Sequence, residues 1–196
     1  MSFTQHQDDQ VPGAGFAQFY PHPDGHALMF DAAANQLYLF SGDSFVSLAI
    51  PMGVSMLVEV GERPRGIGFL PDSSRAYVAN EAAGTVSVFD TSKHEVIATI
   101  PVGQRSNGVQ VLPNGKKVYI SNGGDGSLSV IDTATNKVTA TIPVGKRPWN
   151  MSLTPDGKKL YVANGKSNSV TVVDTINDKA LKEIPVGDTP WGVFVH

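Results

Sequence analysis

The chain has 196 residues, with 15 basic and 18 acidic side chains, a formal net charge of −3 and no cysteine. This length allows one domain or two small ones, and the lack of cysteine excludes disulfides and thiolate chemistry. The balanced charge gives no overall attraction to nucleic acid or to an anionic membrane, and no apolar run is long enough for a membrane span.

The first fifteen residues, MSFTQHQDDQVPGAG, are polar and contain Pro12, Gly13 and Gly15. They show no hydrophobic periodicity, which predicts a flexible lead over residues 1–15. The segment also lacks the apolar core of a secretory signal, so no signal peptide is visible in this sequence.

Residues 16–60 contain a degenerate copy of a unit that recurs clearly further along the chain. The stretch FYPHPDGHALMF carries a Pro-Asp-Gly turn, and NQLYLF places Tyr38 where the later units also have tyrosine. The end of this first unit has two alternative registers, because both LAIPMG at 48–53 and MLVEVG at 56–61 resemble the later ATIPVG. The sequence leaves both registers open.

His22 and His26 lie close in sequence, with Met29, Met52 and Met56 nearby. Imidazole and thioether groups together suit copper. A four-residue spacing places two ligands on one face only in a helix, however, and this segment has the pattern of a turn and a strand. We therefore predict no metal site and no cofactor.

Three further units align without gaps at a spacing of 42 residues, over 61–102, 103–144 and 145–186. A period of this size is typical of four-stranded propeller blades or of two-helix repeats. The landmarks that keep this spacing are a tyrosine, an asparagine and an aspartate, each present three times: Tyr77, Tyr119 and Tyr161; Asn80, Asn122 and Asn164; Asp90, Asp132 and Asp174.

The pattern within each unit distinguishes strands from helices. KKVYISN and SLSVID alternate apolar with polar residues and are rich in Val and Ile, as half-buried strands are. The turn-forming stretches PNG, NGGDG and DTATN separate them. The second unit therefore predicts four strands, A to D, at Gly108–Leu112, Lys117–Ser121, Ser127–Ile131 and Val138–Ile142. Such units imply an all-β fold, a β-propeller with about four blades in this chain.

The motifs YVAN at Tyr77 and Tyr161, YISN at Tyr119, PDGKKLYV at Pro155 and VSVFDT at Val86 resemble the YVTN-type propeller repeats of surface-layer-like proteins. This resemblance covers residues 61–196. It implies a radial propeller, usually of about seven blades, and a location in the periplasm or at the cell surface. A propeller hosts unrelated functions, so the resemblance is a weak guide to activity.

Four blades are fewer than the family usually has, and GDTPWGVFVH at 187–196 begins a fifth unit with strand A only. In one arrangement this last strand pairs with N-terminal strands and closes a four-bladed ring. In the other, the chain is an open arc that a second copy or a different subunit completes, since exposed strand edges are normally covered. We favour the closed ring.

The candidate site lies in the D–A loops, which join strand D of one blade to strand A of the next. In a propeller, strand A lines the central channel, and the D–A and B–C loops share one face. The loops VGERPRG, VGQRSNG, VGKRPWN and VGDTPWG carry basic and aromatic residues at repeated places. These residues are Arg63, Arg65, Arg105, Lys146, Arg147, Trp149 and Trp191. The alternative interpretation is that the arginines merely coat solvent-facing loops and the tryptophans pack between blades.

The opposite face carries Lys116, Lys117, Lys158 and Lys159 interleaved with aspartates, and we interpret it as a solvated surface. Because Arg and Trp are enriched at binding hot spots, we predict a non-catalytic module that binds a protein partner or an anionic ligand at the D–A loop face. The family resemblance implies an alternative, because YVTN-like propellers resemble enzymatic ones: an enzyme-like propeller, either a lactonase or a metal- or redox-cofactor enzyme. A further alternative is an accessory subunit of a larger complex, derived from a truncated propeller. The loops show no ring of His, Asp or Glu, which favours binding over catalysis.

Overall fold

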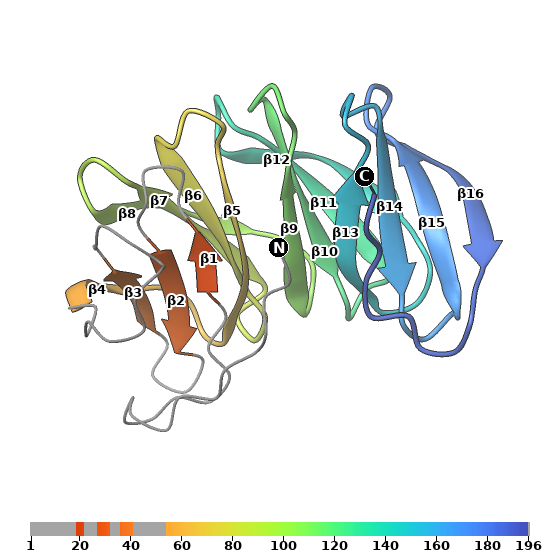
Figure 1. The fold of residues 1–196 in the computed structure, drawn as a ribbon, viewed down its shortest axis with the longest axis horizontal. Coiled ribbons are helices and arrows are strands. Elements are labelled where there is room, and N and C mark those ends of the chain that lie inside the picture. The colour runs from red at the N-terminus through yellow and green to blue at the C-terminus, as the bar shows by residue number, and fades with distance from the viewer. Residues whose placement is uncertain (1–18, 22–26, 32–35, 41–53, 196) are drawn as a thin grey trace.

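The computed structural model describes residues 19–21, 27–31, 36–40 and 54–195, which form four antiparallel sheets of four strands each (Figure 1). We number the sheets as blades 1 to 4. Blade 1 comprises β1 (Phe19–Pro21), β2 (Ala27–Asp31), β3 (Gln36–Phe40) and β4 (Val54–Glu59). Blade 2 comprises β5 (Pro64–Phe69), β6 (Arg75–Asn80), β7 (Thr85–Asp90) and β8 (Glu95–Pro101). Blade 3 comprises β9 (Ser106–Val111), β10 (Lys117–Asn122), β11 (Ser127–Asp132) and β12 (Lys137–Pro143). Blade 4 comprises β13 (Pro148–Leu153), β14 (Lys159–Asn164), β15 (Ser169–Asp174) and β16 (Lys179–Pro185).

The predicted all-β architecture of four-stranded blades is confirmed. The four strands predicted for the second clear unit match β9 to β12 to within two residues at each end. Within each blade the strands pair in chain order, and in blades 2 to 4 short turns connect the successive strands. The described residues contain no helix long and apolar enough to cross a bilayer.

Each kind of turn contains a residue with a positive φ. Every described residue with a positive φ falls at one of four places in the repeat, one in each kind of turn. In the C–D turns these residues are His94, Asn136 and Asp178. The A–B turns use Gly115 and Gly157 at the equivalent place, with φ of 69° and 67°. Glycine, Asn and Asp adopt this conformation at low cost, so the local sequence was sufficient to locate these turns.

Blade 1 resolves the choice between the two registers. β4 pairs with β3 from Glu59 opposite Gln36 to Val54 opposite Phe40. The second register, MLVEVG, therefore supplies most of strand D. The competing stretch at 48–53, the predicted lead over 1–15 and the two histidines His22 and His26 lie outside the described residues.

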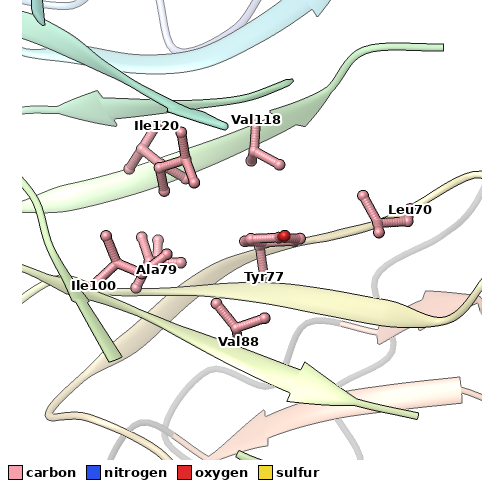
Figure 2. Close-up of a cluster of buried hydrophobic side chains, with 9 residues drawn as sticks. Leu70, Tyr77, Ala79, Val88, Ile100, Val118 and Ile120 are labelled. Atoms are coloured by element: carbon pink, nitrogen blue, oxygen red, sulfur yellow. The ribbon is translucent and has the colours of Figure 1, made fainter. Parts of the chain in front are cut away.

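The hydrophobic core lies between successive blades. One cluster joins Tyr77, Ala79 and Val88 of blade 2 to Val118 and Ile120 of blade 3. Figure 2 shows the ring of Tyr77 in the space between β6 and β10, with the aliphatic side chains around it. A second cluster joins blade 3 to blade 4, and a third lies where blade 1 meets blade 2. Each blade therefore depends on its neighbours for burial, as in other repeat architectures.

The blades form an open arc rather than the closed ring that we favoured from the sequence. Blades 1 and 4 lie at opposite ends of the molecule in Figure 1, and no described strand of one pairs with a strand of the other. Residues 191–195 form no strand and pair with no N-terminal strand. They lie beside β13, where the Val195 amide donates to Ser152 Oγ at 3.2 Å. Closure depends on long-range geometry, which a local repeat pattern does not contain.

Candidate functional site

The D–A and B–C loops share one face of the molecule, as expected for a propeller. The carbonyl oxygen of Arg63 accepts the amide of Glu81 at 2.9 Å, and that of Arg105 accepts the amide of Gly123 at the same distance. The Arg147 carbonyl accepts the amide of Gly165 at 3.0 Å. In each case a D–A loop is tied to the B–C loop of the blade that follows it. These bonds place the three arginines at equivalent sites, which we call the D–A loop face.

The same arginines have an unfavourable backbone conformation. Arg63, Arg105 and Arg147 have φ of 55°, 54° and 55°, and Thr189 at the fourth equivalent place has φ of 51°. A left-handed conformation costs an ordinary L-residue roughly 1–2 kcal/mol. Strained residues of this kind often mark functional sites. The turn itself does not favour arginine, so a different property of arginine accounts for its presence at this place.

Glu81 organises the first pair of basic residues. Its carboxylate lies 2.7 Å from Arg65 Nε and 3.3 Å from Arg63 Nε, and its side chain is only 12% exposed. Glu81 belongs to the B–C loop of blade 2, so the pairing depends on the loop contact described above. The sequence pattern did not indicate Glu81, because Glu81 lies opposite the two arginines only once the B–C and D–A loops meet in the fold. Much of the charge on Arg63 and Arg65 is balanced by this carboxylate.

The positive charges of the second group of basic residues are less balanced by nearby carboxylates. Arg105 and Lys146 are exposed, and neither forms an ion pair among residues 54–195. Their loops are held by equivalent backbone contacts: the Gln104 amide donates to Asp125 Oδ2 at 2.7 Å and the Lys146 amide donates to Ser167 Oγ at 2.6 Å. These loops therefore have an ordered backbone and carry cations that face solvent.

The two tryptophans meet at the end of the arc. Trp149 in β13 and Trp191 lie 42 positions apart, and their ring centroids are 3.9 Å apart at an interplanar angle of 88°. The guanidinium carbon of Arg147 lies 5.0 Å from the centre of the Trp149 ring, within cation–π range. Trp191 is 61% exposed. The structure thus joins Arg147, Trp149 and Trp191 into one cluster with an accessible aromatic surface.

A pocket of about 290 Å³, with both polar and apolar walls, lies between blades 2 and 3 near the D–A and B–C loops. Its walls include Asn122, Asp125, Ser127, Ser129 and Thr141. The described residues contain no group of three or more His, Cys, Asp or Glu side chains arranged to hold a metal ion. The chemical groups of the candidate site are therefore cations, aromatic rings and hydroxyl groups.

Comparison with models of known protein families finds a match for this chain. The model of the family described as Lactonase, 7-bladed beta-propeller, matches residues 4–184. The chain belongs to this family. The propeller implied by the YVTN resemblance is thereby supported, and the lactonase family replaces the surface-layer group as the identified relative. No curated protein matched the sequence.

Solved structures show the same fold. A Bacteroides fragilis protein provisionally assigned as a 6-phosphogluconolactonase has a TM-score of 0.78 at 24% identity, over 98% of this chain and 61% of that one. A similarly assigned Bacteroides uniformis protein has 0.75 at 25% identity, over 88% and 55%. Hydrazine synthase of Kuenenia stuttgartiensis has 0.76 at 23% identity, over 92% and 51%. This lactonase-family chain thus spans half to three fifths of these structures.

Proposed function

We propose that this chain provides the substrate-binding face of a lactonase-type propeller, and that its substrate is a phosphorylated sugar lactone similar to 6-phosphogluconolactone. The observation that carries the proposal is the set of three arginines, Arg63, Arg105 and Arg147, held at equivalent and strained places on one face. Membership of the lactonase family and the names of two structural relatives support this substrate class. The enzyme-like alternative thus replaces the non-catalytic module as the preferred function.

Each part of such a substrate has a complementary group on this face. Guanidinium groups bind phosphate through paired hydrogen bonds, and Arg105 and Arg147 have no carboxylate partner among the described residues. The exposed ring of Trp191, which packs against Trp149 at an interplanar angle of 88°, offers a flat apolar face with a polar edge, suited to one face of a sugar ring.

The reaction adds water to the lactone carbonyl, opens the ring C–O bond and releases the hydroxy acid. Negative charge develops on the carbonyl oxygen during the attack. A fixed cation on the D–A loop face would stabilise that charge more than it stabilises the neutral lactone, and this difference accelerates hydrolysis. The charge distribution therefore favours the D–A loop face as the place where a lactone would bind and react.

The test is calorimetric titration of the full chain with 6-phosphogluconate, the stable product, at low and high salt. Binding should weaken as salt increases, because exposed charges are screened over about 8–10 Å at physiological ionic strength. The double change Arg105→Gln and Arg147→Gln should reduce affinity at least tenfold with little change in Tm. The matched control, Lys116→Gln with Lys158→Gln, removes two exposed lysines from the opposite face and should bind as the parent does. Equal affinities in the two variants would contradict the proposal.

A second candidate is the non-catalytic function, in which the same face binds an acidic protein segment. The observation that favours it is the Arg147–Trp149–Trp191 cluster, because Trp and Arg dominate binding hot spots and Trp191 is 61% exposed. Turnover distinguishes the two candidates. Acid release from 6-phosphogluconolactone above the spontaneous rate, lost in the double arginine variant, supports the lactonase. Binding of an acidic peptide without turnover supports the module.

A further inference from the structure

The pocket between blades 2 and 3 has walls of two kinds. Its apolar walls come from Pro101 and Val102 at the end of blade 2 and from Val138 in β12. Its oxygen atoms belong to the side chains of Asn122, Asp125, Ser127, Ser129 and Thr141. The volume of about 290 Å³ is close to the lower limit of about 300 Å³ for small-molecule sites. The pocket therefore has room for a small organic molecule.

Asn122 presents a buried oxygen atom that receives no hydrogen bond. The residue is fully buried, and its Nδ2 donates to Ser127 Oγ at 3.1 Å and to Ser129 Oγ at 3.0 Å. Among the described residues, its Oδ1 has no hydrogen-bond partner. Both hydrogens of the amide are thus in use, and the free capacity is that of an acceptor. A buried acceptor without a donor is costly, so a ligand that supplies a donor here gains from it.

Asp125 brings a negative charge to the same place. Its Oδ2 and the Cγ of Asn122 each lie 2.5 Å from the position that a Cβ on Gly103 would take, so the two side chains converge over this glycine. The Gln104 amide donates to Asp125 Oδ2 at 2.7 Å and holds the carboxylate in position. The free groups are therefore an amide oxygen and a carboxylate, with hydroxyl groups that can act either as donor or as acceptor. Such a set favours a positively charged ligand with several N–H donors.

The next junction, between blades 3 and 4, shows this space filled by the chain itself. Glu183 stands there in the place of Thr141. Its Oε1 accepts a hydrogen bond from Ser169 Oγ and lies 2.7 Å from the position of a Cβ on Gly145. A carboxylate oxygen thus lies beside the equivalent glycine at both junctions, although different elements supply it. At the junction between blades 2 and 3, the shorter Thr141 leaves the space beside the carboxylate open.

We propose that this pocket binds the ammonium group of a small primary amine. The ammonium group pairs with the Asp125 carboxylate and donates to Asn122 Oδ1, and the carbon chain contacts Val102 and Val138. A metal ion fits less well, because the described residues contain no group of three His, Cys, Asp or Glu side chains and the apolar walls offer no ligand atoms. The inference goes beyond the proposed function and does not depend on what the D–A arginines bind.

The test is a titration of the full chain with n-butylammonium chloride at constant ionic strength, followed by NMR. The signals to follow are the side-chain amide of Asn122 and the backbone amide of Gln104, and both should shift to saturation. Butan-1-ol, a neutral analogue of the same length, should bind roughly tenfold more weakly or worse, because it lacks the charge. Equal binding of the amine and the alcohol would overturn the proposal.

Two variants test the residues. Asp125→Ser should weaken binding of the amine roughly tenfold or more, and the loop should stay folded, because Ser167 at the equivalent place accepts the Lys146 amide at 2.6 Å. Thr141→Gln places an uncharged side chain of the length of Glu183 in the pocket and should abolish binding. Unchanged affinity in either variant would overturn the proposal.

The matched control is Asp156→Ser, which removes an exposed carboxylate from the opposite face and should bind the amine as the parent does. A loss in Asp156→Ser equal to that in Asp125→Ser would show that only the overall charge matters, and would overturn the site. Calcium chloride and sodium chloride are titrated in the same way. Shifts of the Asn122 and Gln104 signals at lower concentrations of either salt than of the amine would identify a metal site and overturn the ligand proposed.

Discussion

Replacing Tyr119 by phenylalanine removes one hydroxyl group and leaves the ring that fills the space between blades 3 and 4. The side chain is fully buried, and its hydroxyl donates to Asp178 Oδ1 at 2.6 Å. Burial, followed by the bond to Asp178, raises the pKa of Tyr119 well above its usual range, so the hydroxyl is a hydrogen-bond donor at neutral pH. Asp178 retains its contact with Lys117 Nζ in the variant.

The expected loss follows from these contacts. A hydrogen bond to a charged acceptor contributes about 1.5–3 kcal/mol, and the acceptor is not left unpaired, so Tyr119→Phe should lower the free energy of unfolding by about 2 kcal/mol. Truncation to alanine also removes the ring and should cost about 3–5 kcal/mol. Tyr161→Phe, at the half-buried equivalent, should cost less than about 0.5 kcal/mol. Urea unfolding measures all three changes, and equal losses for the two phenylalanine variants would refute the reasoning.

Two further predictions concern a loop and a turn. Gly103→Ala places a Cβ 2.5 Å from Asn122 Cγ and should lower the free energy of unfolding in urea by about 1–3 kcal/mol. Gly187→Ala, two repeats later, meets nothing within 4 Å and should be nearly neutral. Similar losses at both positions would show that the contact with Asn122 is irrelevant. Asp132 accepts hydrogen bonds from the hydroxyl and amide of Thr135, and these bonds lower the pKa of its carboxyl group below the usual value of 3.8. The charged carboxylate therefore stabilises the fold at pH values above 3.8, and this stabilisation is lost as the pH falls through the lowered pKa. The gap in stability between the parent and Asp132→Asn should therefore be present near neutral pH and close on acidification, and a gap independent of pH would contradict this.

The parts of the fold that the sequence predicted are those determined by local chemistry. Strand positions followed from alternation, and the turns followed from Asp, Asn and Gly at fixed places, so β9 to β12 were located to within two residues. The placement of the D–A and B–C loops on one face was also correct, because hairpin topology determines it. Each of these features depends on residues within one repeat.

The parts that the sequence did not predict depend on contacts between repeats. The pairing of Glu81 with Arg63 and Arg65 joins two loops of the same blade face and has no counterpart at the next unit, where Gly123 stands. The role of Lys117 also became visible only when Asp178, sixty-one positions away, was brought to it. Ring closure is the extreme case, since it depends on the angle accumulated over all blades. Hydrophobic alternation does not encode that angle.

The D–A position separates what the backbone requires from what the side chain provides. Thr189 has nearly the same φ as Arg63, Arg105 and Arg147, so the turn forms without arginine. At the equivalent places of the other turns the chain uses residues that tolerate this conformation better, among them glycine, Asn and Asp. Glycine at the D–A position would relieve the strain and leave the backbone bonds to the B–C loop in place. The energetic argument for arginine is therefore its side chain, which brings a long, permanently charged hydrogen-bond donor to one face of the propeller.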